Sequence, residues 1–306
     1  MIRFIDKSSG YQPELSICLF VMNALTDILA QRLHFHPEDA HLQTISGGSI
    51  NRCQALSVHD QRYFVKVNSA TAYPGLFEKE KNGLQQLQSA YLRTPKTVDC
   101  FAEGGQQFLV LEWISQELPT KTYWTRLGEQ LASLHRHQSA NYGYSENNYI
   151  GALPQVNDEE SSWTAFFSNH RVLPLVKRAV DTQLLTAEHV KPFDRILQFL
   201  PSLFEEEPPC LLHGDLWSGN MLCGPDQTPV FIDPAVYFGH RSMDLAMTHL
   251  FGGFDPIFYD AYNEAFPFPS HYREQWELCN LYPLLVHLIL FGAGYRSSIL
   301  ELIRRY

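Results

Sequence analysis

The chain has few basic residues, and this shortage narrows the classes of partner that it can bind. Its 306 residues include 23 Lys and Arg against 33 Asp and Glu, which gives a formal net charge of −10. Proteins that follow the phosphate backbone of nucleic acids need a basic stripe that displaces counterions. The composition therefore excludes an extended nucleic-acid platform, although it still allows a locally basic pocket for a small anion.

Long apolar runs and paired cysteine motifs are also missing. No apolar run approaches the ~18–20 residues that span a bilayer. Residues 16–25 form a short apolar stretch without the small-residue cleavage site of a signal peptide. None of the six cysteines forms a C-x-x-C pair, so we expect reduced, buried thiols rather than disulfides or a zinc site. These absences predict a cytoplasmic protein that does not contact membranes. We expect it to be a monomer or weak dimer.

The hydrophobic periodicity changes along the chain. An amphipathic helix is expected from Asn23 onward, and residues 42–111 are strand-like with one helix among them. Beyond about residue 118 the pattern is mostly helical, with Leu127 and Leu131 on one helix face. We therefore predict an α+β fold of two lobes, a small β-rich N-terminal lobe (residues 1–114) and a larger helical C-terminal lobe (residues 115–306).

A glycine-containing segment joins two of the expected strands. Residues 46–51 read SGGSIN, and Gly47, Gly48 and Ser49 would let backbone amides approach a phosphate. The segment matches neither a P-loop nor a G-x-G-x-x-G motif, so an ordinary hairpin turn is an equally simple interpretation.

One lysine and one glutamate are candidates for a buried ion pair. Because side chains alternate across a strand, Lys66 and Phe64 share the face opposite Val65. Glu80 lies on the apolar stripe of the following helix, whereas Glu78 lies on its polar side. A buried charge needs a partner of opposite charge, so the sequence predicts an ion pair between Lys66 and Glu80. The alternative for Lys66 is a strand lysine that extends its amine to solvent.

Residues 108–114 (FLVLEWI) form a buried strand that ends in a polar and aromatic joint at Glu112, Trp113 and Ile114. A flat base could bind the backbone there between apolar walls. A plain core strand is the competing interpretation.

Residues 211–220 (LLHGDLWSGN) carry the most specific signal. Asp215 and Asn220 have the spacing of the H-x-D-x-x-x-x-N catalytic loop of kinases. A predicted hairpin over residues 221–232 returns Asp233 toward Asn220. Asp215 is suited to accept a proton from an attacking hydroxyl, and the amide and carboxylate oxygens of the other two residues suit Mg²⁺. His213 is better placed to brace the loop than to react.

These motifs, in this order, resemble the fructosamine kinase (ketosamine-3-kinase) family, a branch of the protein-kinase-like superfamily near the aminoglycoside phosphotransferases. The resemblance extends from about residue 46 to the C-terminus. Its residues are 64–68 (FVKVN), 150–151 (IG), 154–157 (PQVN), Trp163, 166–167 (FF), 213–220 (HGDLWSGN), 231–235 (FIDPA), 237–240 (YFGH), 244–246 (DLA) and 251–254 (FGGF).

The resemblance implies a bilobal kinase fold that binds ATP between its lobes. Lys66 would hold the α- and β-phosphates and pair with Glu80, and the loop of Gly47, Gly48 and Ser49 would cover the nucleotide. The adenine hinge would be Glu112, Trp113 and Ile114, the catalytic base Asp215, and the Mg²⁺ ligands Asn220 and Asp233. Asp244 would hold the loop structurally, and Trp217 and Tyr237 would either contact the sugar or pack beneath the loop.

The implied reaction is ATP-dependent phosphorylation of the sugar 3-hydroxyl of a ketosamine, either a small molecule or a glycated lysine on a protein. The product breaks down and frees the amine, so the implied role is deglycation repair. Ser49 stands where some relatives carry a redox-active cysteine, which argues against such a switch here.

Other functions fit parts of the sequence. A kinase for another hydroxylated substrate, such as a sugar, an amino alcohol or an aminoglycoside, would need the same catalytic residues. A pseudokinase would bind nucleotide without turnover, but Lys66, Glu80, Asp215, Asn220 and Asp233 are all present. A kinase with protein hydroxyls as substrates is disfavoured because no Ala-Pro-Glu motif follows Asp233.

Overall fold

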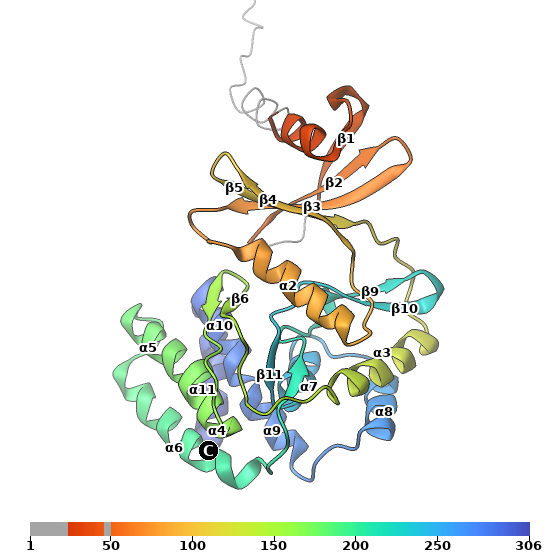
Figure 1. Cartoon of the computed structure of the whole chain (residues 1–306). Helices are drawn as coiled ribbons and strands as arrows, with labels where there is room; N and C mark the ends of the chain where they lie inside the picture. Colours follow the sequence, from red (N-terminus) through yellow and green to blue (C-terminus); the bar gives the residue numbers. More distant parts are fainter. Residues whose placement is uncertain (1–23, 46–49) are drawn as a thin grey trace, which may run out of the picture.

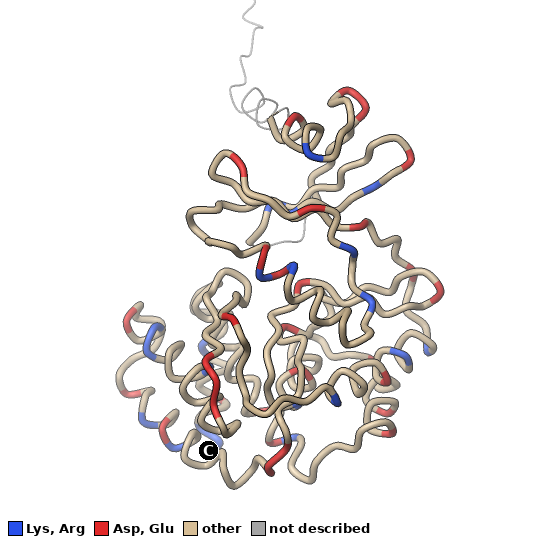
Figure 2. The backbone as a smooth tube through the Cα atoms, in the orientation of Figure 1, with Lys and Arg blue, Asp and Glu red and all other residues tan. Residues whose placement is uncertain are grey.

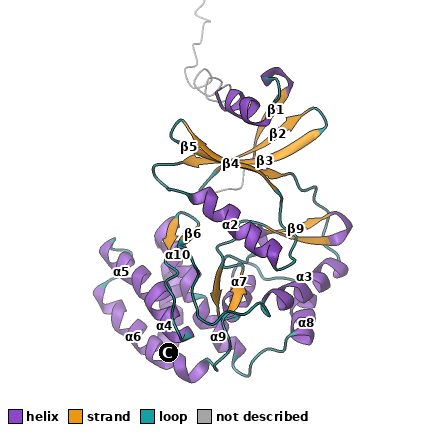
Figure 3. Ribbon diagram, in the orientation of Figure 1, coloured by secondary structure: helices purple, strands orange, loops and turns teal. Residues whose placement is uncertain are grey.

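The computed structural model describes residues 24–45 and 50–306, and these fold into a small sheet-based part and a larger helical part (Figures 1 and 3). The sheet stands at one end of the molecule, and helix α2 lies between it and the helical part. The predicted α+β architecture is confirmed. The last strand of the sheet ends at Glu112 and the next helix begins at Lys121, and a lobe boundary at residue 114 stays a prediction.

The five-stranded sheet is antiparallel throughout, in the order β1-β2-β3-β5-β4. Its strands are β1 (Ala40–Ile45), β2 (Arg52–Val58), β3 (Gln61–Ser69), β4 (Thr97–Glu103) and β5 (Gln106–Glu112), with α2 (Leu76–Ser89) between β3 and β4. The helical residues 24–33 cover one face, where Leu29 packs with Val65. Helix α2 covers the other face, so the alternation along β3 sends Lys66 toward α2.

Helix α2 buries the stripe that the sequence predicts. Leu76, Phe77, Leu84 and Leu87 are all buried on one side of the helix, and the helix begins after Gly75, whose φ of 70° turns the chain into it. Glu80 lies on the same side and therefore faces the interior.

The helical part surrounds a large hydrophobic core. Its helices are α3 (Lys121–Leu134), α4 (Trp163–Phe166), α5 (Leu173–Asp181), α6 (Val190–Leu203), α7 (Ser242–Leu250), α8 (Pro256–Ala265), α9 (Tyr272–Cys279), α10 (Leu281–Phe291) and α11 (Arg296–Arg305), with a π-helical stretch over Phe167–Val172. Three two-stranded antiparallel sheets complete it: β6 (Asn148–Ile150) with β7 (Leu153–Gln155), β8 (Cys210–Leu212) with β11 (Tyr237–Gly239), and β9 (Met221–Gly224) with β10 (Thr228–Phe231). The β9–β10 hairpin is the one predicted next to Asn220.

Charged side chains are dispersed over the surface. Figure 2 shows Lys and Arg scattered along the tube rather than gathered into a stripe. The five cysteines in the described part of the chain are free, and Cys18 lies outside the described residues. Within residues 24–45 and 50–306, no helix combines the length and the apolar character that a membrane span requires.

The crossing of α3 and α8 depends on Gly128. A Cβ atom at this position would lie 2.5 Å from the Phe258 carbonyl oxygen and 2.9 Å from the Tyr262 nitrogen. We expect Gly128→Ala to lower the free energy of unfolding by about 2 kcal/mol, since an overpacked contact must move backbone. Urea unfolding measures this change. Gly294→Ala, where a Cβ would meet open space, is the control, and equal stability of both variants would contradict the prediction.

His240 makes stability depend on pH. It is 1% exposed, and its ring packs against Trp163 and Phe204. Burial lowers the pKa of His240 to about 4, with Arg241 and His135 adding to the effect and Glu207 opposing it. An unfolded histidine titrates near pH 6.5, so the unfolded state binds more protons between these two values, and stability falls as the pH decreases through this window.

The expected loss between pH 7 and pH 5 is about 2 kcal/mol from this one group. Urea unfolding of the protein and of His240→Gln at pH 7 and pH 5 measures it. The variant should show the smaller difference between the two pH values. Burial raises the pKa of Glu207, but the hydrogen bond with Arg241 and the nearby charges of His240, Arg241 and His135 together bring it below its usual value. Glu207 therefore adds a loss of its own at still lower pH. An unchanged difference in His240→Gln would contradict the assignment.

Candidate active site

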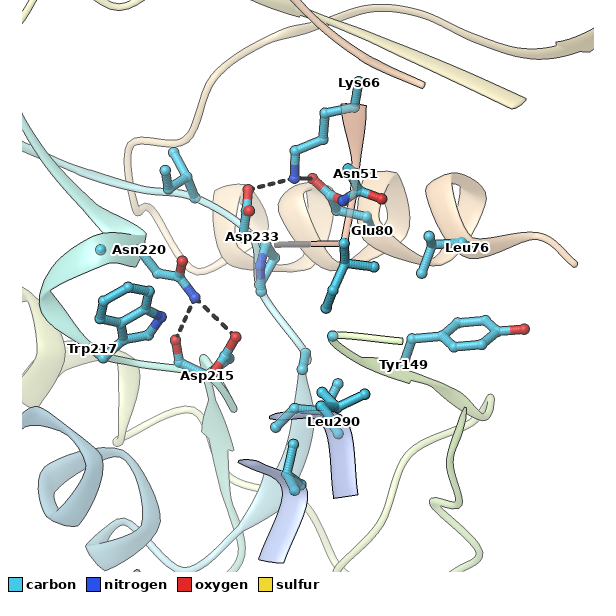
Figure 4. Close-up of a pocket in the computed structure, with 18 of the residues that line it drawn as sticks. Asn51, Lys66, Leu76, Glu80, Tyr149, Asp215, Trp217, Asn220, Asp233 and Leu290 are labelled. Carbon is cyan, nitrogen blue, oxygen red and sulfur yellow. Dashed lines mark hydrogen bonds and ion pairs between the residues drawn. The ribbon is translucent and has the colours of Figure 1, made fainter. Parts of the chain in front are cut away.

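A cavity of about 480 Å³ lies between the sheet and the helical part. Cys53, Phe64 and Lys66 line it from β2 and β3, and Glu80 lines it from α2. From the helical part it is lined by residues of the predicted catalytic loop and of the segment after β10. Figure 4 shows these side chains converging from both sides. The structure thus brings together candidates that are up to 167 positions apart in the sequence.

Lys66 bridges two carboxylates at the top of this cavity. Its Nζ donates to Glu80 Oε1 at 2.7 Å and to Asp233 Oδ1 at 2.6 Å (Figure 4). The ion pair between Lys66 and Glu80 that the sequence predicts is therefore formed. Burial lowers the pKa of Lys66, but attraction to Asp233 and Glu80 raises it more, so the net pKa lies above its usual value and the amine stays charged.

The predicted catalytic loop follows β8, and its backbone is bound by the Asp244 side chain. The backbone N–H groups of His213 and Gly214 donate to the Asp244 carboxylate at 2.8 and 2.9 Å. His213 Nε2 also bonds to the Ile232 carbonyl at 3.0 Å. Gly214 has φ 84°, and a Cβ there would lie 2.1 Å from the Ala235 carbonyl oxygen. His213 and Asp244 therefore brace the loop, as the sequence suggests.

Asp215 and Asn220 are held together by hydrogen bonds within this loop. Asn220 Nδ2 donates to the Asp215 carbonyl at 2.8 Å and to Asp215 Oδ2 at 3.0 Å. Burial raises the pKa of Asp215 to about 7, while the hydrogen bond from Asn220 opposes this shift. A carboxylate with a pKa near neutrality is suited to accept a proton from a hydroxyl.

The β9–β10 hairpin returns the chain to the loop. The Ile232 N–H donates to the Asn220 carbonyl at 3.1 Å, and Asp233 follows in a left-handed conformation with φ 54°. That turn directs the Asp233 carboxylate to Lys66. Strained backbone of this kind persists where the surrounding structure holds it in place.

The donor set at the floor of the cavity suits Mg²⁺. The Asn220 amide oxygen points away from Asp215 (Figure 4), and Asp233 adds a carboxylate that is 39% exposed. In the described residues, no group of three or more His, Cys, Asp or Glu side chains forms a metal cage. Mg²⁺ is commonly held by one or two carboxylates together with substrate phosphates, and this arrangement fits such a shared site.

The predicted hinge residues do not line the cavity with their side chains. The Glu112 carboxylate accepts from Arg93 at 2.6 Å and from the Lys96 N–H at 3.0 Å. The Trp113 ring is covered by the Arg62 guanidinium at 3.7 Å, and Ile114 is buried. These side chains therefore shape the joint between the two parts of the molecule. Gly47, Gly48 and Ser49 lie outside the described residues.

Several cavity residues escaped the sequence analysis, among them Gln116, Lys79 and Tyr149. No local motif marks Gln116, whereas the position of Lys79 beside Glu80 in the sequence could have indicated that Lys79 lies at the site.

The two aromatic candidates for sugar contact differ in their position in the structure. Trp217 lines the cavity and is 38% exposed, whereas Tyr237 is fully buried and lies 4.1 Å from the Arg171 guanidinium.

Comparisons with known proteins agree with this geometry. A model of the family described as fructosamine kinase matches residues 21–306. A protein of Synechocystis named probable ketoamine kinase is 36% identical over 269 residues, which cover 86% of this chain and 89% of that protein. The chloroplastic protein-ribulosamine 3-kinase of Arabidopsis thaliana is 34% identical, with 86% of this chain and 81% of that protein covered.

Solved structures resemble the fold as well. A crystal structure from Thermobifida fusca, classed with the fructosamine-3-kinases, is 35% identical with a TM-score of 0.78 and covers 87% of this chain and 92% of that one. An aminoglycoside phosphotransferase is 16% identical with a TM-score of 0.64, with 92% and 98% covered. At that identity the second likeness concerns the fold alone.

Proposed function

The chain belongs to the fructosamine kinase family, and from this premise we propose that it transfers a phosphoryl group from ATP to the sugar 3-hydroxyl of a ketosamine. The observation that carries the proposal is the convergence of Lys66, Glu80, Asp233, Asp215 and Asn220 in one cavity. The matched relatives are named for ketoamines and ribulosamines. Substrates of this class include small ketosamines and glycated lysines on proteins.

Each residue has a role that follows from its geometry. The Lys66 ammonium, oriented by Glu80, binds the phosphate oxygens of ATP and offsets their charge. Asn220 and Asp233 would hold Mg²⁺, which would neutralise charge on the phosphates. Asp215, kept in place by Asn220, accepts the proton of the sugar hydroxyl as the hydroxyl oxygen bonds to the γ-phosphorus of ATP and the bond from that phosphorus to ADP breaks. The resulting 3-phosphate is unstable and releases the amine, so the biological role is deglycation.

We also propose the compartment and the oligomeric state of the enzyme. We place the enzyme in the cytoplasm, because the five cysteines of the described residues are free, as is usual in a reducing compartment. It acts as a monomer or weak dimer. Size-exclusion chromatography with light scattering measures the oligomeric state, and a stable higher oligomer would contradict this part.

The decisive experiment incubates the protein with Mg-ATP and a small ketosamine, such as a fructoselysine or a ribulosamine derivative. Mass spectrometry then identifies the phosphorylated hydroxyl. A free sugar, an amino alcohol and an aminoglycoside form the comparison panel. Phosphate on the 3-hydroxyl of the ketosamine is the expected result. Turnover of another alcohol without turnover of the ketosamines would replace the substrate class and keep the kinase chemistry.

A further inference from the structure

The β6–β7 hairpin has a structural position that the catalytic roles above do not use. It contains residues 150–151 and 154–155 of the family motif, and residues 156–157 follow it directly. In Figure 1 the hairpin lies directly beneath α2, and β6 is in contact with that helix. Gly151, with φ 57°, forms its turn, and a Cβ there would lie 2.8 Å from Ile50 Cδ1 of the sheet-based part. The hairpin therefore sits against both parts of the molecule.

One side of the hairpin holds α2. Just before β6, the Glu146 carboxylate pairs with Lys79 and accepts from Asn82 Nδ2 at 2.9 Å. Tyr149 OH donates to the Pro74 carbonyl at 3.0 Å, immediately before the helix. Glu80 lies between the two helix residues that Glu146 contacts. The hairpin thus holds the turn of α2 that presents Glu80 to Lys66.

The other side of the hairpin holds the segment that follows Asp233. Asn148 Nδ2 donates to the Val236 carbonyl at 2.9 Å. Gln155 Nε2 donates to the Ala235 carbonyl at 3.1 Å and to Asn148 Oδ1 at 2.8 Å. Asn148 is 7% exposed and Gln155 2% exposed. These bonds fix the two residues that come directly after the Asp233–Pro234 turn.

A buried cation orients this network. Arg171, fully buried, donates to Asn157 Oδ1 at 2.6 Å. Because a guanidinium is a donor only, the Asn157 amide must present its oxygen to Arg171 and its nitrogen to Asn148, where Nδ2 donates to Oδ1 at 2.9 Å. Tyr282 OH donates to Gln155 Oε1 at 2.7 Å in the same way. With their oxygens occupied in this way, Asn148 and Gln155 direct their amide nitrogens to the carbonyls of Val236 and Ala235.

We propose that the β6–β7 hairpin is the positioning element that sets Glu80 and Asp233 relative to each other, with Gln155 and Asn148 as the positioning residues. Both carboxylates must meet the single Lys66 ammonium, and they belong to elements that are otherwise far apart in the chain. The hairpin is bonded to both elements at once. The proposal rests on the proposed function, since it assigns these residues to nucleotide binding in the same site.

The test compares two buried glutamines with the same bonding pattern. Gln275, 1% exposed, donates to the Leu203 carbonyl at 2.9 Å and accepts from Ser242 Oγ at 2.8 Å. Like Gln155, it does not belong to the cavity lining. Met replaces either glutamine with similar volume and no hydrogen bonds. Both variants are expected to lose thermal stability to a similar extent.

Only Gln155→Met is expected to lose function. Loss of a group that orients a ligand-binding residue typically reduces affinity or activity by roughly 10- to 100-fold. The dissociation constant for a fluorescent ATP analogue should rise and kcat should fall by factors of this size, at a temperature where circular dichroism shows both variants folded. Gln275→Met should keep both values. Equal nucleotide affinity and kcat in the two variants would overturn the proposal.

Two smaller substitutions test the proposal if Gln155→Met does not fold. Tyr282→Phe and Ser242→Ala each remove the hydroxyl that donates to one of the two glutamines. A loss of nucleotide affinity confined to Tyr282→Phe supports the proposal, and unchanged affinity in both overturns it. Nucleotide binding does not depend on the acceptor, so a failure of the ketosamine assay would leave this test intact.

Discussion

Replacing Asp215 with Asn is expected to reduce turnover by roughly 10²- to 10⁴-fold, the usual contribution of a general base. The substitution keeps the shape of the side chain and an oxygen that can accept from Asn220 Nδ2. It removes the group that takes the proton of the hydroxyl. Steady-state kinetics with ATP and a ketosamine measures the change in kcat, and a fluorescent ATP analogue measures nucleotide binding.

Mg-ATP binding should be nearly unchanged in Asp215→Asn, because Lys66, Asn220 and Asp233 remain in place. Asp181→Asn, at an exposed ion pair with Lys177, is the matched control and should keep full turnover. Unchanged turnover in Asp215→Asn would remove this residue from the mechanism. A parallel loss of nucleotide binding would instead assign it to the nucleotide site.

Replacing Lys66 with Met is expected to reduce kcat/KM for ATP by roughly 10²- to 10³-fold. This is the usual cost of removing a fixed hydrogen-bond donor from charge that develops in the transition state. The protein should also become less stable, by about 3 kcal/mol, since removing one member of a buried pair leaves a charge uncompensated. Glu80 is the main cause, because its side chain is 10% exposed whereas that of Asp233 is 39% exposed. Urea unfolding measures the stability.

A second substitution separates the two effects of Lys66→Met. Adding Glu80→Gln removes the stranded carboxylate, so the double variant should regain much of the stability while turnover stays low. Lys177→Met at an exposed ion pair is the control and should change neither quantity. If the double variant recovered turnover together with stability, Lys66 would be a structural residue without a role in phosphoryl transfer.

The acidic composition and the nucleotide site are compatible for a local reason. The net charge of −10 argues against extended polyanions, but the site needs only one well-placed ammonium. Lys66 is shared by two carboxylates, so its own charge is more than balanced before ATP arrives. In the proposed mechanism, Mg²⁺ that accompanies the nucleotide would provide the missing positive charge at Asp233, so an acidic chain can form a triphosphate site.

The local parts of the site were predictable because short-range geometry decides them. Asp215 and Asn220 are five residues apart in one loop, and the following hairpin returns Asp233 to them. The pairing of Lys66 with Glu80 follows from strand alternation and from the apolar stripe of the next helix. Each of these inferences uses a fixed period or spacing that a few residues establish on their own.

The side-chain directions at the predicted hinge could not be inferred from spacing or periodicity. The strand before Glu112 was recognisable, but the Glu112 carboxylate turns to Arg93, 19 residues earlier in the chain. Gln116, two residues beyond the expected hinge, lines the cavity instead. No periodicity relates these positions, because the direction of a side chain at a joint depends on the elements that pack there.

The sequence by itself determined the fold class and the local contact between Asp215 and Asn220 in the predicted catalytic loop. Only the tertiary structure decided how the two halves of the site are held together. The bonds from Asn148 and Gln155 to the residues after Asp233 span 88 and 80 positions, and Glu146 reaches α2 across more than 60. Such contacts form between elements whose approach depends on the packing of the whole chain, and therefore no local spacing encodes them.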